Sequence, residues 1–390
     1  MKKLSLVILA GGKGTRLKSI TTKPKPLFEF NKIPFLQHQL NHFSKYNFTE
    51  IIILVGYKSN FFFKYKDNII NSIKIKIVKE KKPLGTGGAI YNLKNIIKND
   101  FIVVNGDTHF PININDFVID RKNSLAFIAL VKNINYKSNT SLINLSLNKK
   151  KIIYHKKSNL MNAGIYYFKK EIFKYLYKGS YSLEKKIFPK LIFEKKLSGK
   201  KYNNFFIDIG TPSNLKFFKR NSKKILFKKS AFLDRDGVIN FDYGYVNQLA
   251  DFKLRPGVLQ GLRYLIKKKY NIFIVTNQAG IAKKKFLFKE YLKFNQQLKK
   301  FFSNKKVFFD AVEFCPHHPN ALVKKYKKKC NCRKPRNGMI EKIIKNFCCT
   351  RKSSFFIGDK NSDMLAAKSS KIKFFHPEKN FLQQIKKIAV

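Results

Sequence analysis

The feature that most constrains this chain is the ten-residue stretch AFLDRDGVIN at 231–240. Its first three residues are apolar and predict a short buried strand, which ends on Asp234 and Asp236. Gly237 then allows the backbone to turn sharply and to approach a ligand. Two carboxylates one residue apart at a strand end suit phosphoryl transfer, because one can attack phosphorus while the other moves protons. A lone Asp-x-Asp is more often an acidic turn, so the interpretation depends on the motifs that follow.

Three later motifs place polar groups after apolar runs. Thr276 lies in IFIVTNQAG, Lys334 in CRKP, and Asp359 with Asp363 in FFIGDKNSD. In a parallel sheet such strand ends meet at one edge. The ordered pattern, over about 229–390, resembles the haloacid dehalogenase superfamily of phosphatases. The closer similarity is to its zinc-containing branch, which holds the D,D-heptose 1,7-bisphosphate 7-phosphatases and the histidinol-phosphate phosphatases.

The resemblance implies a role for each of these side chains. Asp234 attacks phosphorus, and Asp236 protonates the leaving oxygen and then activates water. Thr276 and Lys334 hold the phosphoryl oxygens. Magnesium is expected on Asp234, on Asp359 and on the backbone carbonyl of Asp236.

Other residues of this region are expected to contact the substrate or to position those that do. The segment FDYGYVN at 241–247 overhangs the site in this interpretation. Asp363 is expected to position Lys360 or neighbouring backbone and not to bind metal. The predicted substrate contacts are Asp242, Tyr245, Asn277, Arg333 and Lys360.

All five cysteines lie at or beyond position 315, and three of them stand close to a histidine. The pattern Cys-x-His…Cys-x-Cys predicts a closed tetrahedral zinc site of the structural type. Its predicted ligands are Cys315, His317, Cys330 and Cys332. His318 is the alternative imidazole, and the resemblance favours His317. Cysteines used for metal favour a reducing cytoplasm, and zinc here would hold the loop that carries Arg333 and Lys334.

The N-terminal half opens with an apolar run at 4–9 followed by AGGKGTRL. Free backbone N–H groups at such a loop can wrap a polyphosphate, and Arg16 adds positive charge. The N–H groups expected to do so belong to Gly11, Gly12 and Gly14. The next segment, TKPKPLFEF, carries Lys25 between two prolines. Together, GGxGTRL and PKPL resemble the sugar-1-phosphate nucleotidyltransferases, over roughly 3–217.

This second resemblance implies a nucleotide site and a metal site. Gly85 of PLGTGGAI is expected beside the nucleotide base. Asp107 of FIVVNGDTHF and Asp208 of FFIDIGTPSNL, each read as following an apolar strand, are the expected magnesium ligands. With Arg16 and Lys25 they would neutralise charge while a sugar phosphate attacks the α-phosphorus of a nucleoside triphosphate.

The sugar site is implied by MNAGIYYF and SLEKKIFPKL, which supply Asn162 and Glu184. Taken alone, Asn162 could cap a turn and Glu184 could be a solvated helix residue. The family usually has Glu-Lys before the Asn-Ala-Gly segment, whereas this chain has His155 and a shorter loop. Lys156 is the expected grip on the sugar phosphate, with Lys157 as the alternative.

The two resemblances predict two Rossmann-like, three-layer α/β domains. A nucleotidyltransferase domain is expected at 1–220, a linker at 221–229, and a phosphatase domain with a zinc loop at 230–390. Residues 218–230 have no clear periodicity and many lysines, so they are interpreted as a partly helical connection.

Charge and hydropathy leave one further functional class open. Lys+Arg 81 against Asp+Glu 23 gives a net charge of +58, which would suit a nucleic-acid-binding protein. The lysines are spread along the chain, which favours a general compositional bias and the attraction of phosphorylated substrates. No stretch reaches the ~20 apolar residues that span a bilayer, and the N-terminal run leads straight into the glycine loop, so a buried strand is expected there instead of a signal peptide.

These patterns predict a bifunctional cytoplasmic enzyme. The C-terminal domain would remove the 7-phosphate of a heptose 1,7-bisphosphate, and the N-terminal domain would join the heptose 1-phosphate to a nucleotide, with GTP as the expected donor. PLGTGGAI and VNGDT most resemble the heptose-1-phosphate guanylyltransferases. The alternative is a mannose- or glucose-1-phosphate nucleotidyltransferase joined to a histidinol-phosphate-type phosphatase. The anomer, the base and the oligomeric state stay open.

Overall fold

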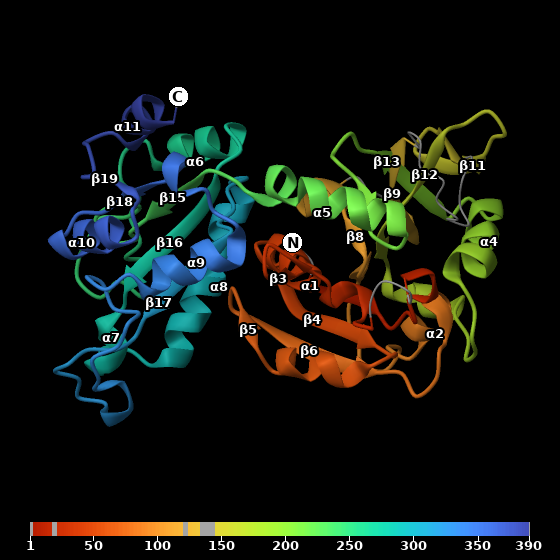
Figure 1. Ribbon diagram of the computed structural model, residues 1–390, viewed down its shortest axis with the longest axis horizontal. Helices are drawn as coiled ribbons and strands as arrows, with labels where there is room; N and C mark the ends of the chain where they lie inside the picture. The colour runs from red at the N-terminus through yellow and green to blue at the C-terminus, as the bar shows by residue number, and fades with distance from the viewer. Residues whose placement is uncertain (1–2, 18–21, 120–123, 133–144, 390) are drawn as a thin grey trace. The chain divides into compact units, whose positions relative to one another are not determined.

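The structure is a computed structural model that describes residues 3–17, 22–119, 124–132 and 145–389. The chain divides into two compact units, Met1–Phe43 with Phe48–Asn221 and Ser44–Asn47 with Ser222–Val390. Each unit combines a large sheet with helices (Figure 1), so the predicted α/β class is confirmed. Within the described part of the chain, no helix has the length and apolar character needed to cross a bilayer.

The first unit is built on a ten-stranded sheet in the order β10-β11-β13-β9-β12-β7-β1-β4-β6-β5. Its strands are β1 (Leu4–Ala10), β4 (Phe48–Val55), β5 (Ile69–Ile70), β6 (Ile73–Lys79), β7 (Phe101–Asn105), β9 (Ala126–Lys132), β10 (Leu145–Asn148), β11 (Lys151–Tyr154), β12 (Leu160–Phe168) and β13 (Leu197–Lys201). The run β6-β4-β1-β7 is parallel, and β12 joins it antiparallel to β7. Nucleotides commonly bind at the carboxyl ends of such a parallel run.

The helices of this unit are α1 (Phe35–Ser44), α2 (Gly85–Tyr91), α3 (Ile114–Ile119), α4 (Phe188–Phe193) and α5 (Pro212–Leu226). Two small sheets pair β2 (Glu29–Phe30) with β3 (Ile33–Pro34) and β8 (Thr108–His109) with β14 (Ile207–Asp208). Strand β1 is apolar apart from Ser5 because both of its faces are covered: Val7 packs with α2 and α4, and Leu6 and Ile8, which point the opposite way, are fully buried. The N-terminal run is therefore a core strand, as predicted.

The connection expected at 218–230 is helical in its first part, because helix α5 continues to Leu226. Phe218, Ser222 and Leu226 are all buried and stand four residues apart on one helix face. The middle residue of these three is a serine, so the sequence does not show the regular spacing of apolar residues that would predict a helix here. The division between the units falls after Asn221, inside this helix.

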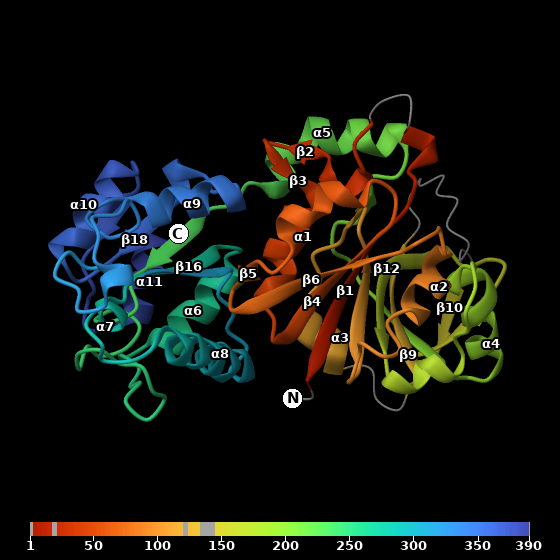
Figure 2. The ribbon, with the colours of Figure 1, turned by 90° about the horizontal axis from the view of Figure 1, so that it is seen from below.

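The second unit has five parallel strands in the order β17-β16-β15-β18-β19. Two of them, β16 and β18, are labelled in Figure 2. They are β15 (Ser230–Leu233), β16 (Asn271–Asn277), β17 (Ala311–Cys315), β18 (Phe355–Ile357) and β19 (Lys373–Phe375). Its helices are α6 (Val258–Lys267), α7 (Ala279–Ala282), α8 (Phe288–Asn304), α9 (Gly338–Phe347), α10 (Asn361–Ser369) and α11 (Phe381–Ile388). The order reverses at β15, which makes the end of this central strand the expected ligand site.

Side chains of β15 alternate between two cores. Ala231 and Leu233 pack with α6, α8 and α11, whereas Phe232 packs on the other face with α9 and α10. Helices therefore cover both faces of the sheet, which is the three-layer arrangement predicted for this half. The strand is short and central, and its carboxyl end fixes the position of Asp234.

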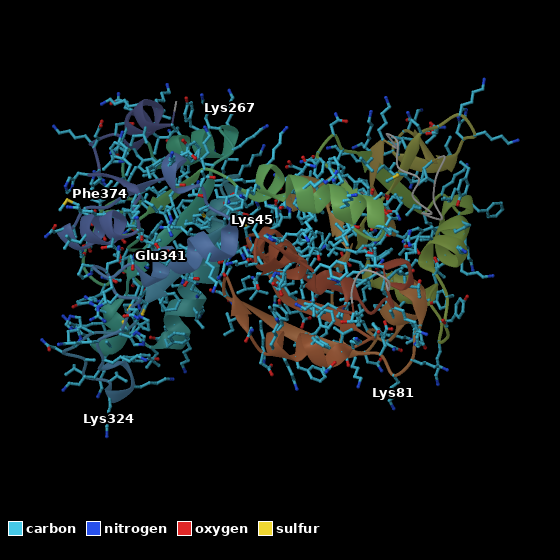
Figure 3. The ribbon with its side chains drawn as sticks, viewed as in Figure 1. Lys45, Lys81, Lys267, Lys324, Glu341 and Phe374 are labelled. Atoms are coloured by element: carbon cyan, nitrogen blue, oxygen red, sulfur yellow. The ribbon has the colours of Figure 1, made fainter. Side chains whose placement is uncertain are left out.

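The charge of the chain is distributed over many surface lysines. Lys81, Lys267 and Lys324, labelled in Figure 3, are exposed and belong to different segments of the two units.

Candidate functional sites

The predicted phosphatase residues meet at the carboxyl edge of the five-stranded sheet. Asp234 directly follows β15, Thr276 lies near the end of β16, and Asp359 comes two residues after β18. They surround or adjoin a cavity of about 460 Å³. The residues that line it are Asp234, Asp236, Asp242, Gly244, Tyr245, Thr276, Asn277, Gln278, Ala279, Gly280, Lys283, His318, Arg333, Lys334, Lys360, Ser362 and Asp363.

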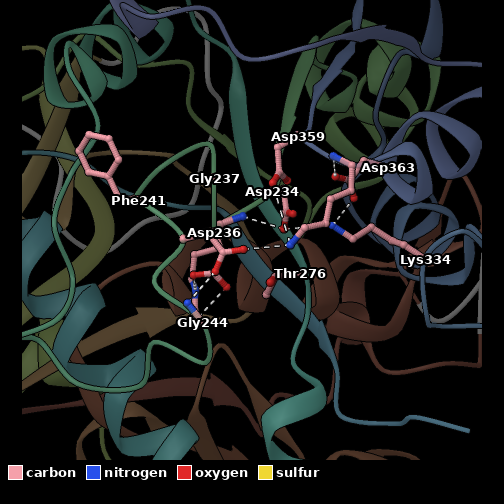
Figure 4. A network of polar contacts seen from close by, with 12 residues as sticks. Asp234, Asp236, Gly237, Phe241, Gly244, Thr276, Lys334, Asp359 and Asp363 are labelled. Atoms are coloured by element: carbon pink, nitrogen blue, oxygen red, sulfur yellow. Dashed lines mark hydrogen bonds and ion pairs between the residues drawn. The ribbon is translucent and has the colours of Figure 1, made fainter. Parts of the chain in front are cut away.

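Asp234 and Lys334 form a buried ion pair at the base of this cavity. The Lys334 Nζ atom lies 3.0 Å from Asp234 Oδ1 and 2.6 Å from Asp363 Oδ1, and Figure 4 shows it between the two carboxylates. Burial raises the pKa of Asp234 to about 7, while Lys334 acts to lower that pKa. Asn277 fixes the backbone of Lys334 by a pair of hydrogen bonds of 3.0 and 3.1 Å. A carboxylate held against a fixed cation can receive a phosphoryl group whose oxygens the same cation binds.

Asp359 supplies the group that best fits a metal ion. Oxygens of Asp234, Asp359 and Asp363 lie within 4.8 Å of one another, and the buried Oδ1 of Asp359 has no hydrogen-bond donor among the described residues. Gly237 has φ +82°, and a Cβ atom there would lie 2.5 Å from Asp359 Oδ2, so glycine is needed for this approach. Hard oxygen ligands of this kind suit Mg²⁺.

Asp363 also does what the sequence indicated. Its Oδ2 atom accepts the backbone N–H of Lys360 at 3.0 Å. The Lys334 contact of its other oxygen was not expected, and it gives Asp363 a second task as a counter-charge. The predicted substrate contacts Asp242, Tyr245, Asn277, Arg333 and Lys360 all line the cavity.

Sequence reasoning missed four of the polar residues that line this cavity. They are Gln278, Lys283, His318 and Ser362. Lys283 begins a run of three lysines in a chain with 81 basic residues, so its type carried no signal. His318 was considered only as a rival zinc ligand, and the structure places it in the cavity lining instead. Nothing in the sequence singled out Gln278 beyond its place directly after Asn277.

The four predicted zinc ligands come together on the loop beyond β17. The sulfur atoms of Cys315, Cys330 and Cys332 lie 3.2–3.5 Å apart, and His317 Nδ1 lies 3.3 Å from Cys332 Sγ. Burial raises the pKa of the Cys315 thiol above its usual range. Three thiolates at this spacing would repel one another, so the cluster fits a tetrahedral cation with no open position.

The first unit has its own cavity, of about 350 Å³, at the carboxyl ends of β1 and β7. Its lining is Leu9, Ala10, Gly11, Gly12, Lys13, Lys25, Pro26, Leu54, Glu80, Pro83, Leu84, Gly85, Thr86, Ala89, Asn105 and Asp107. Gly14 lies just outside this lining with φ +62°, and a Cβ atom there would stand 3.3 Å from Lys25 Cγ. The glycine loop and the Lys25 segment, which the sequence linked only by order, thus face the same space.

Two carboxylates and two cations meet beside this cavity. Lys25 Nζ lies 3.1 Å from Asp107 Oδ2. Asp208 is brought to Asp107 by pairing of β14 with β8, where Asp208 stands opposite Thr108. Burial and the Asp107 carboxylate raise the pKa of Asp208 to about 6, and Lys25 and Arg16 act to lower that pKa. Two crowded carboxylates fit a divalent cation. Asp208 lies in a two-residue strand outside the main sheet, which differs from the apolar strand expected before it.

Asn162 and Glu184 are joined through a buried tyrosine. Tyr166 Oη donates to Glu184 Oε1 at 3.0 Å and accepts from Asn162 Nδ2 at 2.8 Å. Thr86, which lines the cavity, donates to Glu184 Oε2 at 2.8 Å. The residues described as lining the cavity do not include Lys156, which is exposed beyond β11, and nothing in the structure favours it over Lys157.

The glycines of PLGTGGAI have two different tasks. Gly85 lines the cavity with φ +66°. All three glycines lie within α2 and pack closely, since a Cβ atom would fall 2.4 Å from Tyr181 O at Gly85, 2.1 Å from the Tyr181 ring at Gly87 or 1.9 Å from Gly179 O at Gly88. Of the three, only Gly85 also lines the cavity, so its expected place beside a nucleotide base stays a prediction.

Comparison with known proteins gives a separate match for each half. Residues 5–223, more than half of the chain, match the family described as nucleotidyl transferase, and residues 238–381 match the one described as polynucleotide kinase 3 phosphatase. The D-glycero-beta-D-manno-heptose-1,7-bisphosphate 7-phosphatase of Photorhabdus laumondii is 41% identical over 143 residues, which cover 37% of this chain and 76% of that protein. The Escherichia coli K12 protein of that name is 36% identical over 141 residues, 36% of this chain and 74% of that protein. The crystal structure of HddC from Yersinia pseudotuberculosis, 29% identical, covers 56% of this chain and 99% of that chain with a TM-score of 0.48.

Proposed function

Since the chain belongs to the nucleotidyl transferase family in its N-terminal half and to the D-glycero-beta-D-manno-heptose-1,7-bisphosphate 7-phosphatase family in its C-terminal part, we propose that it is a bifunctional enzyme of activated heptose synthesis. One observation carries the proposal: a phosphatase site and a sugar-1-phosphate nucleotidyltransferase site occur in one chain. Removing the 7-phosphate of a heptose 1,7-bisphosphate leaves a heptose 1-phosphate. That product is the class of substrate that the other half of the chain uses.

In the C-terminal unit, phosphoryl transfer begins with Asp234. One of its oxygens attacks the 7-phosphorus, and the aspartyl-phosphate forms as the sugar oxygen leaves. Lys334 and Thr276 bind the phosphoryl oxygens, and Asp236 gives its proton to the sugar oxygen and later takes one from the attacking water. Asp234, Asp359 and the Asp236 carbonyl would hold Mg²⁺. A bound magnesium ion there supplies charge neutralisation for the phosphoryl group.

In the N-terminal unit, the work is positioning and neutralisation of charge. Backbone N–H groups of the glycine loop (Gly11, Gly12 and Gly14) bind the triphosphate, and Arg16 and Lys25 bind its oxygens. The sugar is held by Asn162 and Glu184 while its phosphate oxygen attacks the α-phosphorus and pyrophosphate leaves. Asp107 and Asp208 would hold a second Mg²⁺, which neutralises the triphosphate charge when bound.

The zinc site is proposed to be structural, and it leads to a test of its own. All four ligands are protein side chains, so elemental analysis of the purified protein should find about one zinc per chain. Cys330→Ser should lower the thermal midpoint and the soluble yield, because the remaining thiolates lose their shared counter-ion. Cys348→Ser, which alters a buried cysteine outside the cluster, is the matched control for the loss of a thiol. A fully active protein isolated without zinc would contradict this assignment.

A product assay tests the whole proposal. The protein is offered both anomers of the heptose bisphosphate, then heptose 1-phosphate with each of the four common nucleoside triphosphates. Release of phosphate from one anomer and formation of GDP-heptose are the expected results. Histidinol phosphate, mannose 1-phosphate and glucose 1-phosphate serve as competing substrates, and a clear preference for any of them would reassign the corresponding half.

A further inference from the structure

Arg235, which stands between the two aspartates of the DRD motif, is one of the most deeply buried side chains of the chain, at 1% exposure. Its guanidinium grips Asp236 with two parallel hydrogen bonds, Nε to Oδ1 at 3.1 Å and Nη2 to Oδ2 at 2.8 Å. Nη2 also donates to the carbonyl of Val246 at 2.7 Å. This two-pronged contact fixes the plane of the carboxylate as well as its distance.

Burying this guanidinium costs desolvation free energy, and its contacts do not satisfy all of its N–H groups. The Cζ atom of Arg235 lies 5.4 Å from the centre of the Phe294 ring and 5.9 Å from the centre of the Tyr291 ring, and both rings belong to α8. Yet its buried Nη1 atom finds no acceptor among the described residues. A buried charge with an unsatisfied N–H weakens a fold compared with an apolar side chain of similar size. Arg235 therefore calls for an explanation other than stability.

Apart from Arg235, the side chain of Asp236 is held by neutral donors alone. Besides Arg235, Asp236 accepts a hydrogen bond from Asn240 Nδ2 at 3.0 Å and one from Gln278 Nε2 at 3.2 Å. Both of these donors are neutral amides. Arg235 supplies half of the four hydrogen bonds and the one ion pair that the structure gives to this carboxylate. Without it, the Asp236 carboxylate would keep only two neutral donors, one on each oxygen, and would lose the charged contact that fixes its plane.

We propose that Arg235 is a positioning residue that acts through Asp236, holding that carboxyl group where it can exchange a proton with the leaving oxygen. The inference rests on the proposed phosphatase chemistry and not on the identity of the sugar. In the first step the bond from Asp234 to phosphorus forms and the bond from phosphorus to the ester oxygen breaks. That oxygen takes the proton from Asp236 and leaves as an alcohol. In the second step Asp236 recovers a proton from the water that releases phosphate.

The dependence on leaving group separates this role from a structural one. An alkyl alcohol needs a proton as it leaves, whereas p-nitrophenolate leaves without one. Arg235→Met should therefore lower kcat/KM for the heptose bisphosphate by ~10²-fold, the lower end of the usual value of acid catalysis, and change it little for p-nitrophenyl phosphate. Fructose 1,6-bisphosphate replaces the heptose compound if the wild type does not hydrolyse the latter. Arg235→Lys keeps the charge but loses the two-pronged grip, so it should recover part of the loss.

Two further variants complete the test. Asp236→Asn should show the same dependence on leaving group, and adding Arg235→Met to it should cause no further loss, because a residue that acts through Asp236 has nothing left to position. Arg255→Met is the matched control, since Arg255 supports the same loop through Gly237 O at 2.7 Å without touching Asp236. It should affect both substrates equally.

Each outcome decides between the two proposals. Equal losses for both phosphates in the Arg235 variants, or additive losses in the double variant, would overturn the positioning role and leave the phosphatase assignment intact. If circular dichroism shows that Arg235→Met does not fold, the comparison of the two substrates with Arg235→Lys alone decides the positioning role. A wild-type protein that hydrolyses none of the three phosphates would overturn the phosphatase assignment and this inference together.

Discussion

Replacing Asp234 with asparagine is expected to abolish phosphate release while nucleotidyl transfer continues. The substitution removes the attacking oxygen anion but keeps the shape of the side chain. Lys334 retains Asp363 as a partner at 2.6 Å, so its buried charge is not left without a counter-charge and the fold should persist. Asp251→Asn, which changes an exposed aspartate outside the cavity lining, is the matched control and should be as active as the wild type.

The covalent intermediate gives a direct measurement of the same role. Mass spectrometry of acid-quenched enzyme should find a phosphoryl group on the peptide that contains Asp234. Asp236→Asn keeps the nucleophile and loses proton transfer, which is worth ~10²–10⁴-fold in rate, so slow turnover and some trapped intermediate are expected. Normal turnover by Asp234→Asn, or a phosphoryl group on another peptide, would refute the mechanism and the placement of the site.

The second large effect is expected from Asp107→Ala, which should abolish nucleotidyl transfer and leave phosphate release unchanged. Burial, together with the nearby Asp107 carboxylate, raises the pKa of Asp208 to about 6, and a cation that needs both carboxylates cannot be held by one. Lys25 loses its partner at 3.1 Å but remains near Asp208, so gross unfolding is not expected.

Separate assays of the two reactions check this result. Pyrophosphate release reports transfer, and phosphate release from the bisphosphate reports hydrolysis. Asp116→Ala, at an exposed position in α3, controls for the loss of an acidic residue in the same unit. If phosphate release fell as far as pyrophosphate release, with an unchanged circular dichroism spectrum, the assignment of two independent metal sites would be wrong.

The sequence predicts those parts of the two sites that follow apolar strands. Asp234, Thr276 and Asp359 each stand at the end of a parallel strand, and the geometry of a parallel sheet leaves few other places for them. The cluster of Cys315, His317, Cys330 and Cys332 was equally predictable from the sequence, because four possible ligands at short spacing constrain one another. The α/β class follows from the same alternation of apolar runs and helical segments.

Other features of the fold and sites depend on contacts between segments that lie far apart in the sequence, and no local sequence pattern predicts these contacts. Asp208 reaches Asp107 through a two-residue strand, so only the similarity of the surrounding motif identified it. The last two turns of helix α5 show no clear periodicity in the sequence, because Ser222 interrupts the buried stripe. The close packing of Gly87 and Gly88 depends on the segment around Tyr181, nearly a hundred residues away.

The abundance of basic residues also makes the functional ones hard to identify from the sequence of this chain. Lys283 lines the phosphatase cavity, yet in the sequence it is one lysine in a run of three. Arg235 was visible between two aspartates, but its burial against α8 and its two hydrogen bonds to Asp236 are seen only in the structure. A basic residue says little about its task until its burial is known.

The zinc cluster has a consequence for the cell as well as for the fold. Lys334 follows Cys332 by two residues, so the cation that faces the proposed nucleophile is placed by the loop that carries the cluster. The first unit has no such cluster among its described residues. If the cluster holds zinc as proposed, zinc starvation would stop the phosphatase reaction while the nucleotide-transferring half stayed intact but without substrate.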